Sequence, residues 1–378
     1  MPNNWAAIAP ILYGAGRIVP RELTGLIAAV DVDFSDKNVA KGDTVTVPIS
    51  PVATVGAFTA AQTFTAGTDR TATSKILTLG QENVSSWNMT SEQERSLGNG
   101  GTGDDVLAQT TKQHIRAHVN AIEAYLWGVA RKAASRATGT AATSPFATDQ
   151  KPLADALKIM LDNGAGNMDM SAVIDTVAGA DLRKVANLFK VNEGGNDSLL
   201  RYGVLGSLYN FDIRESAAVT TATKGTGTLY TSSAAGFAIG ATSIPIITGS
   251  GTVLAGDVVA FAGDTNKYVV TTGLAAPGTL VIAEPGLRIA LAASAVAMTV
   301  GNTATQNLCL RRDAIKLVAR PGLQPETPAI QQWTIADEQS KLSFLVYRSV
   351  GDGMASWYMR TVFDAVAINP YAVVQLLG

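Results

Sequence analysis

The clearest hydrophobic pattern in the chain is one apolar stripe between Asp104 and about Ala137, a stretch without proline. Its members recur at steps of three and four: Leu107, Thr111, Ile115, Val119, Ile122, Leu126 and Val129. This spacing places them on one face of an α-helix, roughly 50 Å long at about 1.5 Å per residue. Asp104 and Asp105 suit its start, and Thr138-Gly139 suits its end. Such a length is typical of the backbone of a domain.

A second pattern alternates Thr and Val from Thr44 to Val47 and predicts a strand with two different faces. No residue from 44 to 68 is charged, and β-patterns return at 75–79 and 84–89. Together these segments predict a long β-hairpin. Proteins normally protect a long uncharged edge, so we expect a neighbouring subunit to cover it. Burial of the hairpin within its own domain remains an equal alternative.

Residues 153–220 show alternating helix and strand patterns, with helices at 153–161 and 178–189 and strands at 171–176 and 205–216. From Asn307 the mixed pattern resumes, and 308–310 with 314–318 suggest a strand pair. Further β-patterns close the chain at 342–348, 356–363, 365–369 and 372–377. We expect these last strands to form an antiparallel sheet that packs on the long helix.

Between these mixed regions the composition changes at about Thr221, and no charged residue occurs from Gly225 to Gly256. Turn residues separate five short β-patterns, at 243–247, 257–261, 267–271, 279–282 and 295–300. Short strands at this spacing are typical of a small barrel or sandwich. We therefore predict an inserted all-β domain over residues 221–302.

The composition of the chain limits the classes of protein to which it can belong. The 378 residues are 47% hydrophobic but only 16% charged, with a net charge of -2. Surface that becomes an interface can do without charge, whereas a dedicated nucleic-acid binder normally carries a basic domain. The single cysteine excludes an internal disulfide. We find neither a secretory signal nor an apolar run long enough for a transmembrane helix, so no membrane association is expected.

Catalytic chemistry has few candidates. His114 and His118 share a helix face, but Ile115 stands where a metalloprotease pattern needs Glu, and we interpret both as polar surface residues. Cys309 lies in an apolar, strand-like segment and is interpreted as a core residue. The glycines at 98–103 are not followed by Lys-Ser/Thr, so we interpret them as a joint rather than a phosphate loop. No catalytic residue, cofactor or metal is predicted.

The order of these parts resembles the tailed-bacteriophage major capsid proteins of the HK97-like fold, most of all the coat proteins of short-tailed phages with an inserted β-barrel. The stretches that carry the resemblance are Lys41–Val47, Ala180–Lys184, Phe211–Ser216, Gly256–Gly263, Asn307–Ile315 and Trp357–Pro370. No single motif is diagnostic of the family, and the resemblance rests on the order in which the motifs follow one another.

The resemblance implies an α+β chain with an HK97-like architecture. Its segments would be an N-terminal arm (1–42), the extended loop with flanking strands (43–97), the spine helix of the peripheral domain (98–140), the first part of the central domain (141–220), the inserted barrel (221–302), the central-domain return (303–335) and the closing strands (336–378). The arm and the extended loop would reach over neighbouring subunits.

The implied function is self-assembly of identical chains into pentamers and hexamers of an icosahedral shell around the double-stranded DNA of a phage. Partners would be other copies of the chain, a separate scaffolding protein, a portal and the packaged DNA. The protein would reside in the virion capsid, and in the host cytoplasm during assembly. Competing interpretations are an encapsulin-like compartment shell, another phage structural protein (tail or decoration), and an enzyme with a β accessory domain.

Two sets of residues are singled out. The expected subunit contacts are Trp5, Val52, Val55, Phe58, Phe64 and Lys75. The long helix also has a mild basic bias, which either faces DNA loosely or is only a solvated surface. Its cations that could face DNA are Lys112, Arg116, Arg131 and Lys132. Some relatives crosslink a loop lysine to an asparagine of a neighbour. Lys75 and Asn369 could correspond, but we favour an uncrosslinked shell.

Overall fold

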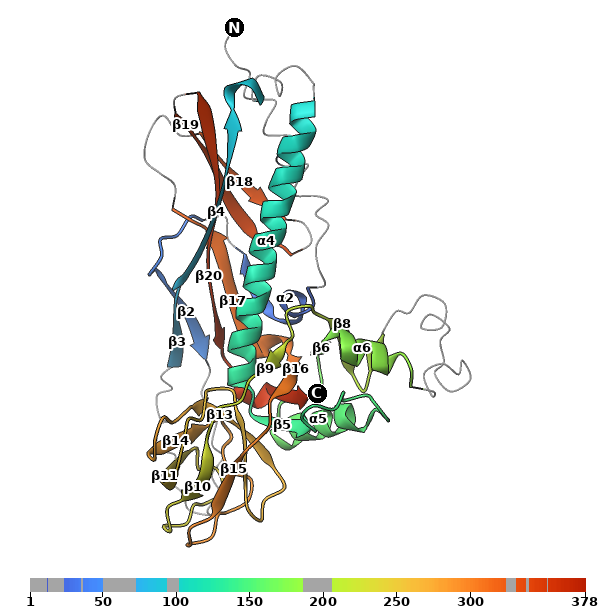
Figure 1. The fold of residues 1–378 in the computed structure, drawn as a ribbon, viewed down its shortest axis with the longest axis vertical. Helices are drawn as coiled ribbons and strands as arrows, with labels where there is room; N and C mark the ends of the chain where they lie inside the picture. The colour runs from blue at the N-terminus through green and yellow to red at the C-terminus, as the bar shows by residue number, and fades with distance from the viewer. Residues whose placement is uncertain are drawn as a thin grey trace, which may run out of the picture.

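The computed structural model describes residue 12 and residues 24–34, 37–49, 73–93, 102–185, 206–323, 331–337, 340–351 and 353–378. One long helix, α4 (Thr102–Ala133), runs beside a peripheral sheet. Near its C-terminal end it meets a central sheet and, below that, a small all-β domain (Figure 1). Four of the predicted contact residues on the uncharged segment, and Trp5, lie outside the described residues.

The predicted helix is confirmed, with a correction at its end. Its stripe forms the middle of the main core, where Ile115, Val119, Ile122 and Leu126 are completely buried. The helix stops at Ala133 because the next residues form a strand, β5 (Arg136–Gly139), not a last helical turn. β5 pairs in parallel with β21 (Val373–Leu377), and these sheet contacts override local helix propensity.

The peripheral sheet has the strand order β1-β17-β20-β19-β18, and β4 pairs with the other edge of β20. Its strands are β1 (Asp31–Phe34), β4 (Gln81–Thr90), β17 (Ile315–Pro321), β18 (Gln331–Ala336), β19 (Ser343–Gly351) and β20 (Met354–Ala367). The predicted sheet on the long helix is thus confirmed. However, 356–363 and 365–369 are not two strands, because β20 continues through Asp364. β4 belongs to this sheet rather than to the predicted hairpin.

The central sheet follows the order β5-β21-β16-β6-β8-β7. β9 pairs with the first two residues of β16, Ala304 and Thr305. These strands are β6 (Met170–Ile174), β7 (Ser207–Leu208), β8 (Phe211–Glu215), β9 (Thr221–Ala222) and β16 (Ala304–Arg311). The last predicted strand, β21, lies here and not in the peripheral sheet. The predicted pair 308–310 and 314–318 is also wrong, because the 3-10 turn η2 (Arg312–Ala314) sends β16 and β17 into different sheets.

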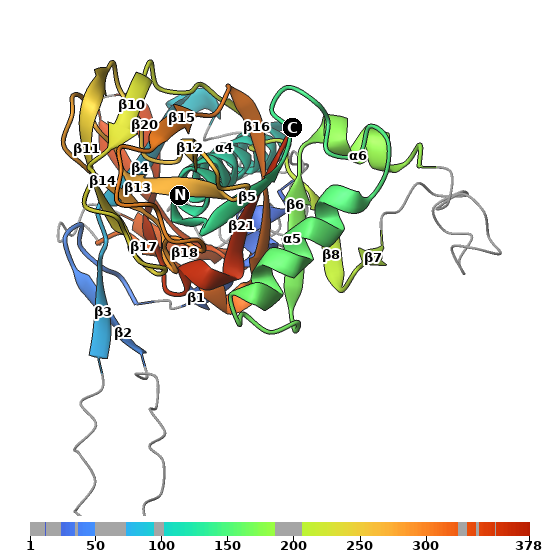
Figure 2. The same ribbon diagram turned by 90° about the horizontal axis from the view of Figure 1, so that it is seen from below.

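Two helices flank the central sheet (Figure 2). α5 (Lys151–Asp162) matches its prediction and turns its buried Leu153, Ala156 and Met160 inward. α6 (Thr176–Leu182) is shorter than predicted. The carboxylate of Asp175 caps it by accepting hydrogen bonds from the backbone N–H groups of Val177 and Ala178.

The inserted domain is a closed barrel. Its strand order is β12-β15-β10-β11-β14-β13, and a β12–β13 pairing completes the ring. The strands are β10 (Thr228–Ser232), β11 (Ser243–Ser250), β12 (Val258–Phe261), β13 (Lys267–Thr272), β14 (Thr279–Ile282) and β15 (Ala297–Val300). All five predicted strands are present, and β10 is the one that the prediction missed. The barrel has its own core, separate from the main one.

Candidate assembly surfaces

The β-hairpin of β2 (Thr44–Ile49) and β3 (Thr73–Thr78) forms a sheet of its own and projects from the body (Figure 2). Its base is attached through Leu77, which packs with Val39, Leu79, Val318 and Val362. No residue of β2 is buried, and Ile76 is 63% exposed. An isolated pair of strands is only marginally stable in water, so this hairpin gains from cover by another chain.

Lys75 lies on this hairpin and already has a partner in its own chain. Its ammonium group donates to the backbone carbonyl of Ala367 over 2.5 Å. That carbonyl is two residues from Asn369, the residue considered for a crosslink. Lys75 thus fastens β3 to the end of β20, and its role in a subunit contact remains a prediction.

The helix–sheet interface contains an aromatic stack. His114 stacks on Trp87 with ring centroids 4.4 Å apart, Trp87 lies 6.0 Å from Trp357, and Trp357 lies 5.6 Å from Trp333. These rings come from α4, β4, β20 and β18, so the stack joins the helix to three strands. It is one of several contacts between α4 and the peripheral sheet, beside the buried stripe and the hydrogen bond of Tyr125 to Asp364.

The interpretation of the two histidines as polar surface residues is wrong for His118. Its side chain is only 3% exposed, its Nε2 lies 2.9 Å from the Ser85 hydroxyl, and its ring packs edge-on to Phe344. Burial, followed by the effect of His114, lowers the pKa of His118 to about 4. Among the described residues, no group of three His, Cys, Asp or Glu side chains could hold a metal.

Glu123 is a buried structural residue that the sequence did not reveal. Its carboxylate is 1% exposed and accepts the backbone N–H groups of Leu26 (2.7 Å) and Ile27 (2.9 Å), the first residues of α2 (Leu26–Ala29). The Ser216 hydroxyl donates to it over 2.7 Å. Burial raises the pKa of Glu123, and these hydrogen bonds act in the opposite direction. Glu123 therefore joins three segments that are distant in sequence.

The four cations predicted on the long helix are not equivalent. Arg131 turns toward the junction with the barrel, where it donates to the Gln306 amide oxygen over 3.3 Å and lies over the Trp127 ring at 5.2 Å. Lys112 and Arg116 are half-buried, and Lys132 is exposed. Arg131 is thus engaged within its own chain, and a DNA-facing role of any of the four cations remains a prediction.

Cys309 lies on β16 and is completely buried, as its interpretation as a core residue required. Burial raises the pKa of its thiol to about 12. A thiol in this state is protonated at neutral pH and is a poor nucleophile. Within the described part of the chain, no helix is long and apolar enough to cross a membrane.

The fold is shared with solved phage structures. The chain superposes on a protein of Mycobacterium phage Che8 with a TM-score of 0.50 and 13% identity, over 95% of this chain and 93% of that one. For the capsid of the cyanophage P-SCSP1u the TM-score is 0.51 and the identity 10%, over 95% and 90%. No protein-family model and no curated protein sequence matches. The chain therefore has the predicted α+β, HK97-like fold of phage capsid subunits.

Proposed function

We propose that this protein is a major capsid protein that assembles into the icosahedral shell of a tailed bacteriophage. The observation that carries the proposal is the fold itself, because the likeness to a cyanophage capsid extends over nearly the whole of both chains. At 10% identity, no single residue is transferred from that capsid to this chain.

The hairpin supports this proposal independently. Beyond its base at Leu77, this two-stranded sheet has exposed side chains on both strands, and it offers backbone edges and apolar side chains such as Ile76 to a neighbour. Assembly into pentamers and hexamers would bury such surfaces many times over. Obligate interfaces of this type cover roughly 2,000–5,000 Å².

The role that we propose is structural rather than catalytic. The partners are other copies of the chain, a scaffolding protein and a portal during assembly, and packaged DNA through contacts without sequence preference. Assembly would take place in the host cytoplasm, and the product would be the capsid of the virion. Lys112, Arg116, Arg131 and Lys132 are the helix cations that we propose for loose DNA contacts.

Electron microscopy of the purified protein, alone and with its candidate scaffolding protein, tests the proposal. Closed shells built of pentamers and hexamers are the expected result, and their diameter would give the lattice size. A monodisperse monomer under both conditions, without particles at high protein concentration, would contradict the proposal.

A further inference from the structure

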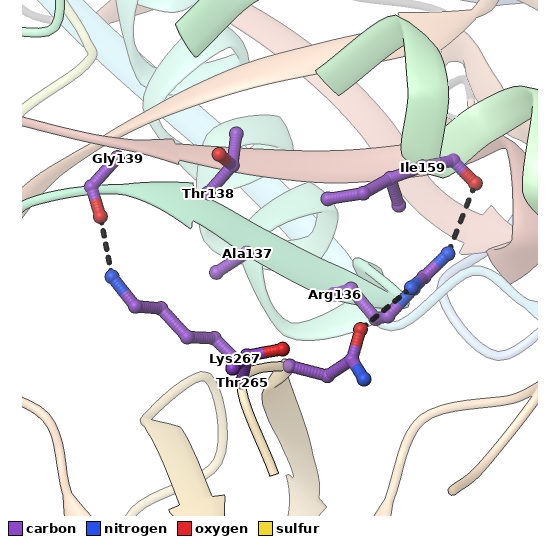
Figure 3. Close-up of a pocket in the computed structure, with 8 residues that line it drawn as sticks. Arg136, Ala137, Thr138, Gly139, Ile159, Thr265 and Lys267 are labelled. Atoms are coloured by element: carbon purple, nitrogen blue, oxygen red, sulfur yellow. Dashed lines mark hydrogen bonds between the residues drawn. The ribbon is translucent and has the colours of Figure 1, made fainter. Parts of the chain in front are cut away.

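A cavity of about 250 Å³ lies where the inserted barrel meets the central sheet (Figure 3). β13 pairs with β5 only at Lys267 with Ala137 and at Tyr268 with Arg136. The chain before Lys267 turns away into the β12–β13 loop, so Thr138 and Gly139 lose their neighbour on that side. The cavity fills the space between this loop, β5 and Ile159 of α5.

Two cations stand at opposite ends of this cavity (Figure 3). Lys267 reaches from the barrel, and its ammonium group donates to the Gly139 carbonyl over 2.5 Å. Arg136 belongs to β5, and its side chain is only 4% exposed. It donates to the Asn266 amide oxygen from Nη1, and to the Ile159 carbonyl and the Asn163 amide oxygen from Nη2. Its buried Nε has no hydrogen-bond partner among the described residues.

No carboxylate lines the cavity, although two lie close by. Asp162 is 3.9 Å from Arg136, but it also pairs with Lys158 at 3.0 Å. Asp264 accepts the Tyr268 hydroxyl over 2.6 Å and the Asn266 side-chain amide over 2.7 Å. Burial and then the neighbouring Arg288 lower the pKa of Arg136. Asp162, Tyr268 and Asp264 act in the opposite direction, but none of the three lines the cavity itself.

We propose that this cavity is a binding site for an oxyanion of the phosphate type, held between Arg136 and Lys267. Charge-assisted hydrogen bonds from a guanidinium and an ammonium group are the usual means of holding such an anion, and two further polar residues, Thr138 and Thr265, also line the cavity. The volume equals that of about eight water molecules, at about 30 Å³ each, which leaves room for an oxyanion and its remaining waters.

The bound anion would act as a clamp between two parts of the fold. Arg136 is fixed in the central sheet, whereas Lys267 and Thr265 belong to the barrel. An anion that contacts both sides favours the native junction over any state in which the barrel swings away. The source is either free inorganic phosphate or the phosphodiester groups of packaged DNA, which share this chemistry. The DNA source rests on the proposed shell function, whereas binding of inorganic phosphate does not.

Thermal melting of the full-length protein tests the clamp, with sodium phosphate compared against sodium chloride at equal ionic strength and pH 7. A ligand that binds only the folded state raises the melting temperature as its concentration rises above its Kd. We expect a phosphate-specific increase in the wild type. The increase should be absent in Lys267→Met, which keeps the aliphatic stem but loses the ammonium group.

The matched control is Lys224→Met, which removes the same charge where the chain enters the inserted domain; its amine lies 3.5 Å from Asn302, and neither residue lines the cavity. It should retain the full phosphate-specific increase. Because Lys267 also binds Gly139, its loss can lower the baseline melting temperature. The increment between the two salts is therefore the quantity compared, together with the Kd from isothermal titration with inorganic phosphate. That Kd should rise at least about 10-fold in Lys267→Met.

A second titration with a short DNA duplex distinguishes the two sources. Binding of the duplex that requires Lys267, without a response to inorganic phosphate, assigns the site to DNA phosphodiesters. A response to inorganic phosphate alone assigns it to the free ion. The inference is overturned if the wild type responds to neither ligand, or if Lys267→Met responds to both as the wild type does.

Discussion

The hairpin and the inserted barrel share one property in sequence and differ completely in structure. Both are built from long stretches without charge, residues 44–68 and 225–256. In the barrel, strands of this kind close into a ring and bury Tyr230, Ile244 and Ile246 in a core of their own. In the hairpin, β2 and β3 pair only with each other, and every side chain of β2 remains accessible.

The difference shows that the absence of charge has two physical meanings. Where enough strands close on each other, uncharged segments become core and need no partner. Where two strands stand away from the body, the same composition leaves apolar side chains and backbone edges in water. Only the second case indicates an assembly surface. Substitutions in the two regions and in the body between them should therefore differ in their effect on stability, most of all in the barrel core and least on the hairpin.

The largest effect is expected in the barrel core. Phe261 is buried beside Tyr268, with ring centroids 6.1 Å apart. Phe261→Ala should lower the free energy of unfolding of the barrel by about 3–5 kcal/mol, because it removes apolar contacts and leaves a cavity. Urea denaturation measures this loss. Ile239→Ala, at an exposed position of the same domain, is the control and should change stability little. Equal effects of the two variants would mean that the barrel core does not hold the domain together.

Much of the fold was predictable because periodicity reports directly on burial. The helical stripe from Leu107 to Leu126 and the β-patterns of the barrel both describe which side chains leave water, and they were located within a few residues. The pairing of strands with one another could not be predicted in the same way. β4, β16 and β21 were each recognised as strands but assigned to the wrong neighbours, because strand pairing depends on distant segments that a local pattern does not contain.

Two buried polar residues of the long helix, Glu123 and His118, were less predictable than the fold. Glu123 lies on the helix between the apolar positions 122 and 126, and this placement beside the stripe was the only sign that a carboxylate would be buried. Its partners, Leu26 and Ser216, are about 93 to 97 residues away. His118 likewise shares the stripe with Ile115 and Ile122, yet its polar chemistry suggested a surface position. In both cases burial follows from the tertiary contacts of a whole helix face.

The next largest effect is expected at Glu123, which joins the long helix to α2 and to Ser216 and has no contact with the hairpin in the hydrogen bonds described. Glu123→Gln replaces one accepting oxygen by an amide that cannot accept a backbone N–H, so one donor of α2 loses its partner. The free energy of unfolding should fall by about 2–3 kcal/mol in urea denaturation. Asp155→Asn, which removes an exposed ion pair with Lys151, is the control and should cost less than about 1 kcal/mol. An unchanged free energy of unfolding in Glu123→Gln would show that the hydrogen bonds of Glu123 do not hold α2 to the long helix.

A smaller effect is expected from pH, through His118. Its pKa is about 4 in the folded chain and about 6.5 when unfolded, so the unfolded chain takes up the proton first as the pH falls. Stability is therefore fully present above about pH 6.5 and is lost between there and pH 4. From pH 7 to pH 5 the expected loss is about 2 kcal/mol. Urea denaturation at the two pH values should show it in the wild type and not in His118→Leu. An identical pH dependence in both proteins would show that His118 does not carry it.

The smallest effect on stability, and the sharpest test of the comparison, is expected on the hairpin. Ile76 is 63% exposed on β3, and Ile247 is 52% exposed on β11 of the barrel. Replacing either by Asp should change the free energy of unfolding of the single chain by no more than about 0.5 kcal/mol, because both side chains are already in water. The two variants should differ in their ability to assemble. We expect Ile76→Asp to prevent closed shells in electron microscopy, since a charge at a covered position must be desolvated, and Ile247→Asp to permit them. Shells formed by Ile76→Asp but not by Ile247→Asp would reverse the assignment and make the uncharged barrel the contact surface.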